Sequence, residues 1–196
     1  MSDLFQKKFH IDGDCFGNLT KIGYYDYFGH PSFAPPLNYI CDWMDSISPL
    51  LSIVELGSGT APILQFLKGT HPYAGIDFSQ VPIDVCGVKW KDSQNAHFVQ
   101  ADLASYFDSP DPVIHCDVLY DGNVFWYFNR DRIADYIDKA MQRIRARYFV
   151  TMECDIFFPF PECSFMRLLQ AQKFVVNIPS IPEFKRQRTI EIYERI

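Results

Sequence analysis

The sequence predicts one α/β domain built on a doubly wound, mostly parallel β-sheet. Three observations favour this class: apolar runs of strand length alternate with helical patterns, several runs end in a carboxylate, and a glycine-rich turn follows the first run. Continuous apolar runs are typical of strands covered on both faces. The chain has 196 residues, 48% of them hydrophobic, which is enough for one substantial core. We expect residues 50–196 to form the sheet domain and residues 1–49 to form an arm that belongs to it.

The arm combines an aromatic stretch with a helix. Residues 24–33 are dense in Tyr and Phe, and residues 37–47 carry apolar side chains three and four positions apart, which predicts a helix. The aromatic stretch has two interpretations. It is either a flap over a ligand site or an arm packed into the core, because aromatic side chains serve both purposes.

The first sheet strand is expected within residues 50–56, and it leads into a turn with two glycines. Glu55 lies near the end of the strand, Gly57 and Gly59 follow, and Pro62 begins the next helical stretch. Glycine permits positive φ and lets a ligand approach the backbone, and proline suits the first helical position. A turn of this kind also occurs in domains that bind a nicotinamide cofactor or nothing at all.

The next two strands are also expected to end in carboxylates. Residues 73–79 contain Asp77, which lies 20 positions after Gly57, where a doubly wound fold holds the ribose diol of a nucleotide. The alternative is that Asp77 caps the following helix. A third strand over residues 96–103 contains Asp102.

The last part of the chain completes the predicted sheet. A fourth strand over residues 112–120 is followed by Asp121, and a helix over 131–147 precedes a strand over 148–152. A helix over 162–170 and strands over 174–178 and 189–193 follow, and the alternation in the last of these predicts an exposed edge strand.

The segment Val-Glu-Leu-Gly-Ser-Gly-Thr at residues 54–60 resembles the first motif of class I S-adenosylmethionine (SAM) dependent methyltransferases. This resemblance implies a Rossmann-like, seven-stranded sheet with an antiparallel edge strand, and SAM as cofactor, with S-adenosylhomocysteine as product. It also implies that Asp77 binds the ribose hydroxyls, that Asp102 accepts from the adenine amino group, and that the backbone of Leu103 meets the ring. The expected cofactor-binding residues are Glu55, Gly57, Ser58, Gly59, Asp77, Phe78, Asp102, Leu103, Tyr120 and Asp121.

The methyl acceptor is expected to be a small, partly apolar metabolite that accepts on O, N, S or C. An Asn-Pro-Pro-Tyr sequence, which the family uses on nucleic-acid bases, is absent after the fourth strand. The expected catalytic residues are Tyr24, Tyr25 and Glu153, with Asp121, Asp155 and His30 as further candidates for a general base. No spacing of carboxylates, histidines or cysteines predicts a metal site. Two alternatives are a methyltransferase acting on a protein side chain and a catalytically silent SAM-binding partner subunit.

Charge and cysteine content limit the partners. The net charge of −6 disfavours nucleic acid, although residues 130–196 hold 12 Lys and Arg against 9 Asp and Glu, whereas residues 1–129 hold 6 against 15. Six cysteines without a CxxC pair predict free thiols in a reducing compartment. No apolar run is long enough for a membrane span. We expect a cytoplasmic monomer or homodimer that binds neither nucleic acid nor a membrane.

Overall fold

The computed structural model describes residues 34–122, 124, 132–154, 169–176 and 188–195. Several predictions fall outside these ranges: the aromatic stretch over 24–33 with Tyr24, Tyr25 and His30, the loop after Asp155, and residues 162–168 of the expected helix. Within the described ranges, no helix is long and apolar enough to cross a membrane.

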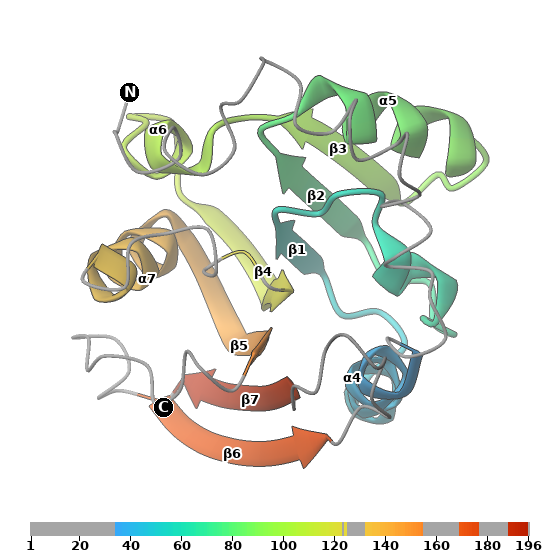
Figure 1. Cartoon of the computed structure of the whole chain (residues 1–196), viewed down its shortest axis with the longest axis vertical. Helices are drawn as coiled ribbons and strands as arrows, with labels where there is room; N and C mark the ends of the chain where they lie inside the picture. The colour runs from blue at the N-terminus through green and yellow to red at the C-terminus, as the bar shows by residue number, and fades with distance from the viewer. Residues whose placement is uncertain (1–33, 123, 125–131, 155–168, 177–187, 196) are drawn as a thin grey trace.

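The strands form one sheet in the order β3-β2-β1-β4-β5-β7-β6 (Figure 1). Strands β1 to β5 run parallel to one another, and β7 runs antiparallel to both of its neighbours. The doubly wound, mostly parallel arrangement with an antiparallel strand is therefore confirmed. The strand bounds are Ile53–Leu56 for β1, Tyr73–Asp77 for β2, Ala96–Gln100 for β3, Ile114–Gly122 for β4, Ile144–Cys154 for β5, Leu169–Val176 for β6 and Arg188–Arg195 for β7.

Helices cover both faces of the sheet (Figure 1). On one face lie α6 (Leu103–Phe107) and α7 (Ile133–Arg143), and on the other lie α4 (Ala34–Ile47), the 3-10 helix η2 (Pro62–Gln65) and α5 (Gln80–Lys89). Neighbouring strand residues enter opposite cores: Leu119 packs with α7, whereas Val118 and Tyr120 pack with α4. This alternation follows from the two-residue period of a strand, and it explains why residues 118–120 of β4 are apolar at every position.

The expected helix over 131–147 was too long. Helix α7 ends at Arg143, and Ile144 begins β5 in an extended conformation. From this point the side chains alternate, with Ile144 and Ala146 buried and Arg145 and Arg147 exposed. The period of two predicts a strand rather than a helix, and the pairing of Ile144 with Ile114 of β4 fixes it.

The expectation that residues 189–193 form an exposed edge strand was also wrong. Strand β7 pairs with β5 on one side and with β6 on the other, so it lies inside the sheet. Ile190 and Ile192 are accordingly buried. Leu169 and Gln170, expected at the end of a helix, belong to β6, which takes the edge position.

Buried polar contacts attach α4 to the sheet. The ring of His71 lies 2.9 Å from Oδ1 of Asp45 in α4, through Nε2, and 3.1 Å from the carbonyl oxygen of Leu51, through Nδ1. Asp45 also accepts from the backbone N–H groups of Lys68 and Gly69. The residues around the first two strands are therefore fixed to the helix that precedes them. Of the cysteines described, Cys41 and Cys86 are buried and Cys116 is half-buried, all as free thiols.

Candidate cofactor site

The expected site lies at the carboxyl ends of β1, β2 and β4. Strand β1 lies between β2 and β4, so the chain reverses its direction of winding next to β1. Ligands of doubly wound proteins bind at this switch point, beyond the carboxyl ends of the strands. Glu55, Asp77 and Asp121 all lie at this edge, where Leu56 pairs with Asp121 and with Ile76.

The glycine turn after β1 needs its glycines for two different reasons. Gly57 and Gly59 have φ of 60° and 51°, in the left-handed region that favours glycine. A Cβ at Gly57 would also overlap the side chain of Val124, whereas one at Gly59 would meet nothing within 4 Å. The backbone at Gly59 therefore faces open space, which leaves room for a ligand to approach it. Ala61 takes a third positive φ, of 52°.

Glu55 is a buried carboxyl group inside the sheet. It is 4% exposed and accepts a hydrogen bond from the hydroxyl of Tyr73. Its neighbour on β2 is Gly75, and Tyr73 reaches Glu55 diagonally across the two strands. Burial raises the pKa of Glu55 to about 8, opposed by the Tyr73 hydrogen bond and reinforced by the charges of Asp121 and Asp77. Glu55 is thus a proton-bearing group at pH 7 that a nearby cation would ionise.

Asp77 holds two segments together with one carboxylate. Its Oδ2 accepts from the N–H of Gly59 and its Oδ1 from the N–H of Ser79, each at 2.9 Å. Ser79, at the N-cap position of α5, makes no side-chain capping bond. The alternative, that Asp77 is the N-cap of α5, is therefore wrong: Ser79 holds that position, and Asp77 binds the N–H of Ser79. Each carboxylate oxygen still has a second lone pair for a ligand hydroxyl, and burial raises the pKa of Asp77.

Phe78, Asp102 and Leu103 lie at the ends of β2 and β3. The N–H of Ala101 donates to the carbonyl of Asp77 at 2.8 Å, which holds these two ends together. Asp102 is exposed and caps α6 by accepting from Ser105 at 2.9 Å, and the side chain of Leu103 is buried in the core. Phe78 is 37% exposed at this end of the sheet. An exposed ring at this end of the sheet suits stacking with a base.

Tyr120 and Asp121 end β4 and are both buried. Asp121 accepts from the N–H of Val124 and from the hydroxyl of Thr151 on β5, each at 3.0 Å. The described contacts therefore give Asp121 a structural role in fixing the residues after β4. Thr151 gave no signal in the sequence, because its contact depends on the pairing of β4 with β5.

A small cavity of about 40 Å³ opens beside the glycine turn. It joins the expected residues with others that the sequence did not single out. Leu37 comes from α4 and Met152 from β5, and both are apolar. The full lining is Leu37, Glu55, Gly57, Ser58, Gly59, Thr60, Pro62, Tyr120, Gly122 and Met152. Sites for small molecules usually measure about 300–1,000 Å³, so this cavity is too small to enclose a whole ligand of that class.

The hydroxyl of Ser58 is buried and has no hydrogen-bond partner within the described part of the chain. An unsatisfied buried hydroxyl costs about 1–3 kcal/mol, so it is either a local defect or a contact for a ligand. Glu153 lies in β5 opposite Thr189 of β7, near the same edge. Among the residues described, no group of three or more His, Cys, Asp or Glu side chains is arranged to hold a metal.

No protein-family model matches the sequence, and no curated protein matches it. Solved structures do match its fold. The N-methyltransferase NodS from Bradyrhizobium japonicum WM9, in complex with S-adenosylhomocysteine, has a TM-score of 0.67 at 10% identity, over 84% of this chain and 88% of that one. Magnesium protoporphyrin IX methyltransferase (ChlM) from Synechocystis PCC 6803, with bound SAM, has a TM-score of 0.62 at 12% identity, over 83% and 80%.

The bifunctional kinase-methyltransferase WbdD is similar too, with a TM-score of 0.62 at 16% identity. The match covers 85% of this chain, which spans less than half of WbdD, at 42% of that chain. The chain therefore has the fold of SAM-dependent methyltransferases. The resemblance found in residues 54–60 is confirmed at the level of the fold.

Proposed function

We propose that the protein is a SAM-dependent methyltransferase that acts on a small, partly apolar metabolite. The observation that carries the proposal is the buried Glu55 beside the glycine turn, at the switch point of a methyltransferase fold. Burial disfavours the charged form of Glu55, which accepts a hydrogen bond from the neutral hydroxyl of Tyr73, and an ammonium or sulfonium ligand is the complementary charge.

The residues present fit SAM. The open space at Gly59 gives backbone access, and the adjacent carboxylate of Asp77 has lone pairs for ribose hydroxyls. Phe78 supplies an exposed ring for adenine, with Asp102 and the backbone of Leu103 as its polar partners. Bound SAM would supply an electrophilic methyl group, and the protein would contribute mainly by aligning donor and acceptor.

The lining of the cavity supports an acceptor with apolar character. Leu37, Pro62 and Met152 contribute apolar side chains to the lining, beside the polar groups of Glu55, Ser58 and Thr60. The acceptor atom and the general base stay open, and the catalytic roles of Tyr24, Tyr25 and Glu153 remain predictions. The proposal includes a cytoplasmic monomer or homodimer that binds neither nucleic acid nor a membrane.

Calorimetric titration of the full chain with SAM and with S-adenosylhomocysteine tests the cofactor. We expect saturable binding of both, and at least tenfold weaker binding, about 1.4 kcal/mol, in Asp77→Ala. Asp92→Ala removes an exposed carboxylate elsewhere and should bind as the unaltered protein does. Absence of binding by a folded sample would overturn the cofactor assignment. Binding without methylation of any compound in a metabolite extract would favour a silent partner subunit.

A further inference from the structure

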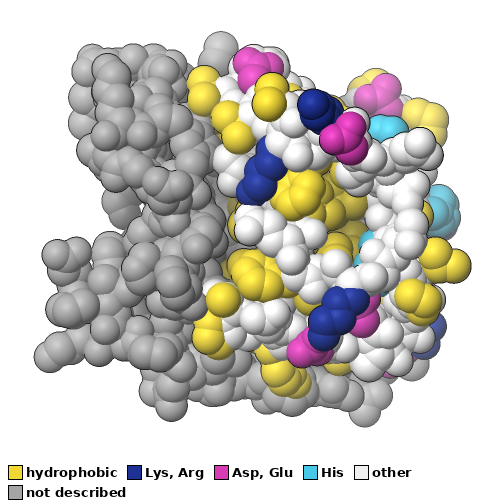
Figure 2. All heavy atoms as spheres, turned by 90° about the vertical axis from the view of Figure 1, so that its right-hand side faces the viewer, with side chains coloured by type: hydrophobic (Ala, Val, Ile, Leu, Met, Phe, Trp, Pro, Cys, Tyr) yellow, Lys and Arg dark blue, Asp and Glu magenta, His cyan; other side chains and the backbone are white. Residues whose placement is uncertain are grey.

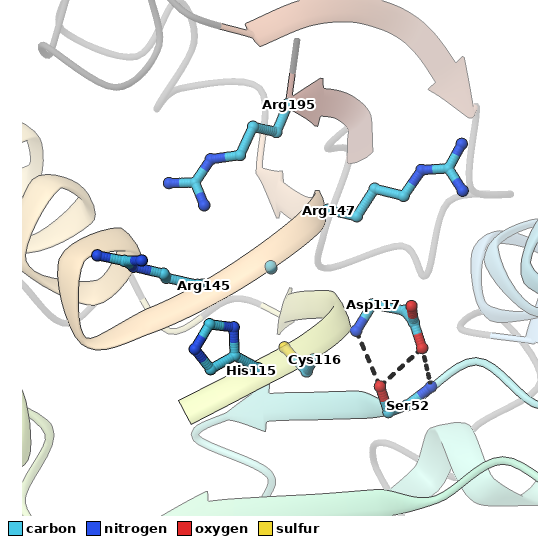
Figure 3. Close-up of a pocket in the computed structure, with 8 residues that line it drawn as sticks. Ser52, His115, Cys116, Asp117, Arg145, Arg147 and Arg195 are labelled. Carbon is cyan, nitrogen blue, oxygen red and sulfur yellow. Dashed lines mark hydrogen bonds between the residues drawn. The ribbon is translucent and has the colours of Figure 1, made fainter. Parts of the chain in front are cut away.

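A second and larger cavity lies at the opposite end of the parallel strands from the glycine turn. Its volume is about 630 Å³, within the range of small-molecule sites. It opens where β4 and β5 begin and β7 ends, whereas the proposed cofactor site lies where β4 ends. We call it the arginine pocket, and Figure 3 shows its lining: Ser52, His115, Cys116, Asp117, Arg145, Ala146, Arg147 and Arg195.

The sheet register gathers basic side chains in this pocket. His115 of β4 pairs with Arg145 of β5, and the side chains of both are exposed. Arg195 reaches the same place from the end of β7. In Figure 3 the guanidinium groups of Arg145 and Arg195 point to the same side of the hollow, with the His115 ring below Arg145. Arg147 points the other way.

The carboxylates in and beside the pocket already accept hydrogen bonds from other residues. Asp117 accepts from the N–H and the hydroxyl of Ser52, at 2.8 and 2.7 Å. Glu194 accepts from Arg147, with the nearest N–O distance 2.9 Å, and Arg147 also lies over the ring of Tyr148. No carboxylate within the described ranges pairs with Arg145. Arg145 therefore gives the pocket a positive charge that pairs with no carboxylate in the described part of the chain.

The chain as a whole carries a net charge of −6. Elsewhere in the described ranges, Lys68, Arg132, Lys139 and Arg143 each pair with an aspartate. Figure 2, which views the molecule from the side of α4 and α5, shows acidic and basic side chains interspersed on that face. Arg145 has no carboxylate partner in the described ranges, and Arg195 lines the same hollow. These two features make the pocket suitable for binding an anion.

We propose that the arginine pocket binds the phosphate group of a small molecule through Arg145 and Arg195. The guanidinium group is planar, always charged and carries paired donors that match the oxygens of a phosphate. His115 offers a further ring nitrogen at the rim. Gly122 lies seven residues after His115 along β4, or about 23 Å at 3.3 Å per residue, so this site is separate from the proposed cofactor site.

The test is calorimetric titration of the full chain with pyrophosphate and with inorganic phosphate, at an ionic strength held constant with sodium chloride. We expect saturable binding of pyrophosphate, weakened at least tenfold in Arg145→Gln and in Arg195→Gln. Lys91→Gln is the matched control, because Lys91 is exposed, has no carboxylate partner in the described ranges and lies outside the pocket. It should bind pyrophosphate as the unaltered protein does.

Three results would overturn the proposal. They are absence of saturable binding in the unaltered protein, an equal loss in Lys91→Gln, and binding of single-stranded RNA but not pyrophosphate in a manner that needs Arg145. Because Arg145 is exposed, its variant should melt at an unchanged temperature. SAM titrated into Arg145→Gln should bind normally, so failure of this proposal is distinguishable from failure of the proposed cofactor site.

Discussion

The carboxylate of Asp77 accepts a hydrogen bond from the backbone N–H of Gly59, with 2.9 Å between Oδ2 and the nitrogen. The end of β2 thus holds the turn that follows β1, and the same carboxylate is the proposed ribose ligand. Asp77 therefore has a structural role in the turn and a proposed role in binding the ribose, and experiments have to separate these two roles.

Replacement of Asp77 by Asn should lower the free energy of unfolding by about 1–3 kcal/mol. An amide has only one oxygen, so it cannot accept from both Gly59 and Ser79. Urea denaturation measures the loss. Ser79→Ala is the control and should stay within about 0.5 kcal/mol, because the Ser79 side chain makes no capping bond. A larger loss in Ser79→Ala than in Asp77→Asn would contradict this.

Alanine at Gly57 should destabilise the protein more than alanine at Gly59. Both positions have positive φ, which costs a non-glycine residue about 1–2 kcal/mol. At Gly57 the new methyl group also overlaps Val124, whereas at Gly59 the space is open. Thermal unfolding of the two variants measures the difference. Gly59→Ala should instead weaken SAM binding, since its methyl group fills the space proposed for the ligand. Equal stabilities of Gly57→Ala and Gly59→Ala would show that the side chain of Val124 moves away from the new methyl group without a cost in stability.

The buried Glu55 should make stability fall as pH rises. Unfolded, this carboxyl group loses its proton near its ordinary pKa of 4.5, but folded it keeps the proton up to about 8. Between these values the unfolded state binds fewer protons, so the free energy of unfolding decreases by up to about 1.4 kcal/mol per pH unit. Denaturation at pH 5.5, 6.5 and 7.5 tests this, and Glu55→Gln should lose the dependence. The same slope in the variant would assign it to other groups.

Binding of SAM at pH 7 should release a proton from Glu55, if the proposed function is right. A cation beside this carboxyl group favours its ionised form and lowers its pKa. Titration in two buffers of different ionisation enthalpy measures the number of protons released. Glu55→Gln should release none from this position. If the number of protons released is the same in the unaltered protein and in Glu55→Gln, the cation of the ligand does not bind beside Glu55.

Removal of the His71 ring should destabilise the protein by about 2–3 kcal/mol, because both ring nitrogens contact buried acceptors on Asp45 and Leu51. His97→Ala is the matched control. His97 is exposed on β3, so its loss should change stability by no more than about 0.5 kcal/mol. Thermal unfolding of both variants checks this, and similar melting temperatures would mean that α4 is held by its apolar face alone.

Local patterns in the sequence were sufficient to predict the strand ends and the turn from which the proposed cofactor site is built. Glu55, Gly57, Gly59 and Asp77 follow from strand length, glycine spacing and the distance between consecutive strands, which are short-range features. The helix boundary at Arg143 was missed because Ile137, Ala140 and Ile144 continue a helical spacing. The alternation of buried and exposed side chains that favours a strand extends over only four residues, 144–147. The pairing of these residues with β4 makes them part of a strand.

Hydrophobic period and turn chemistry act over a few residues, so the amino-acid sequence was enough to predict the doubly wound class and the carboxylates beside the glycine turn. Strand pairing in three dimensions brings Thr151 to Asp121, places β7 inside the sheet, and brings Arg145 and Arg195 to one hollow. Thr151 and Asp121 are 30 positions apart in the sequence, and Arg145 and Arg195 are 50 apart. These placements depend on which strands pair and in which register, and no local pattern carries that information.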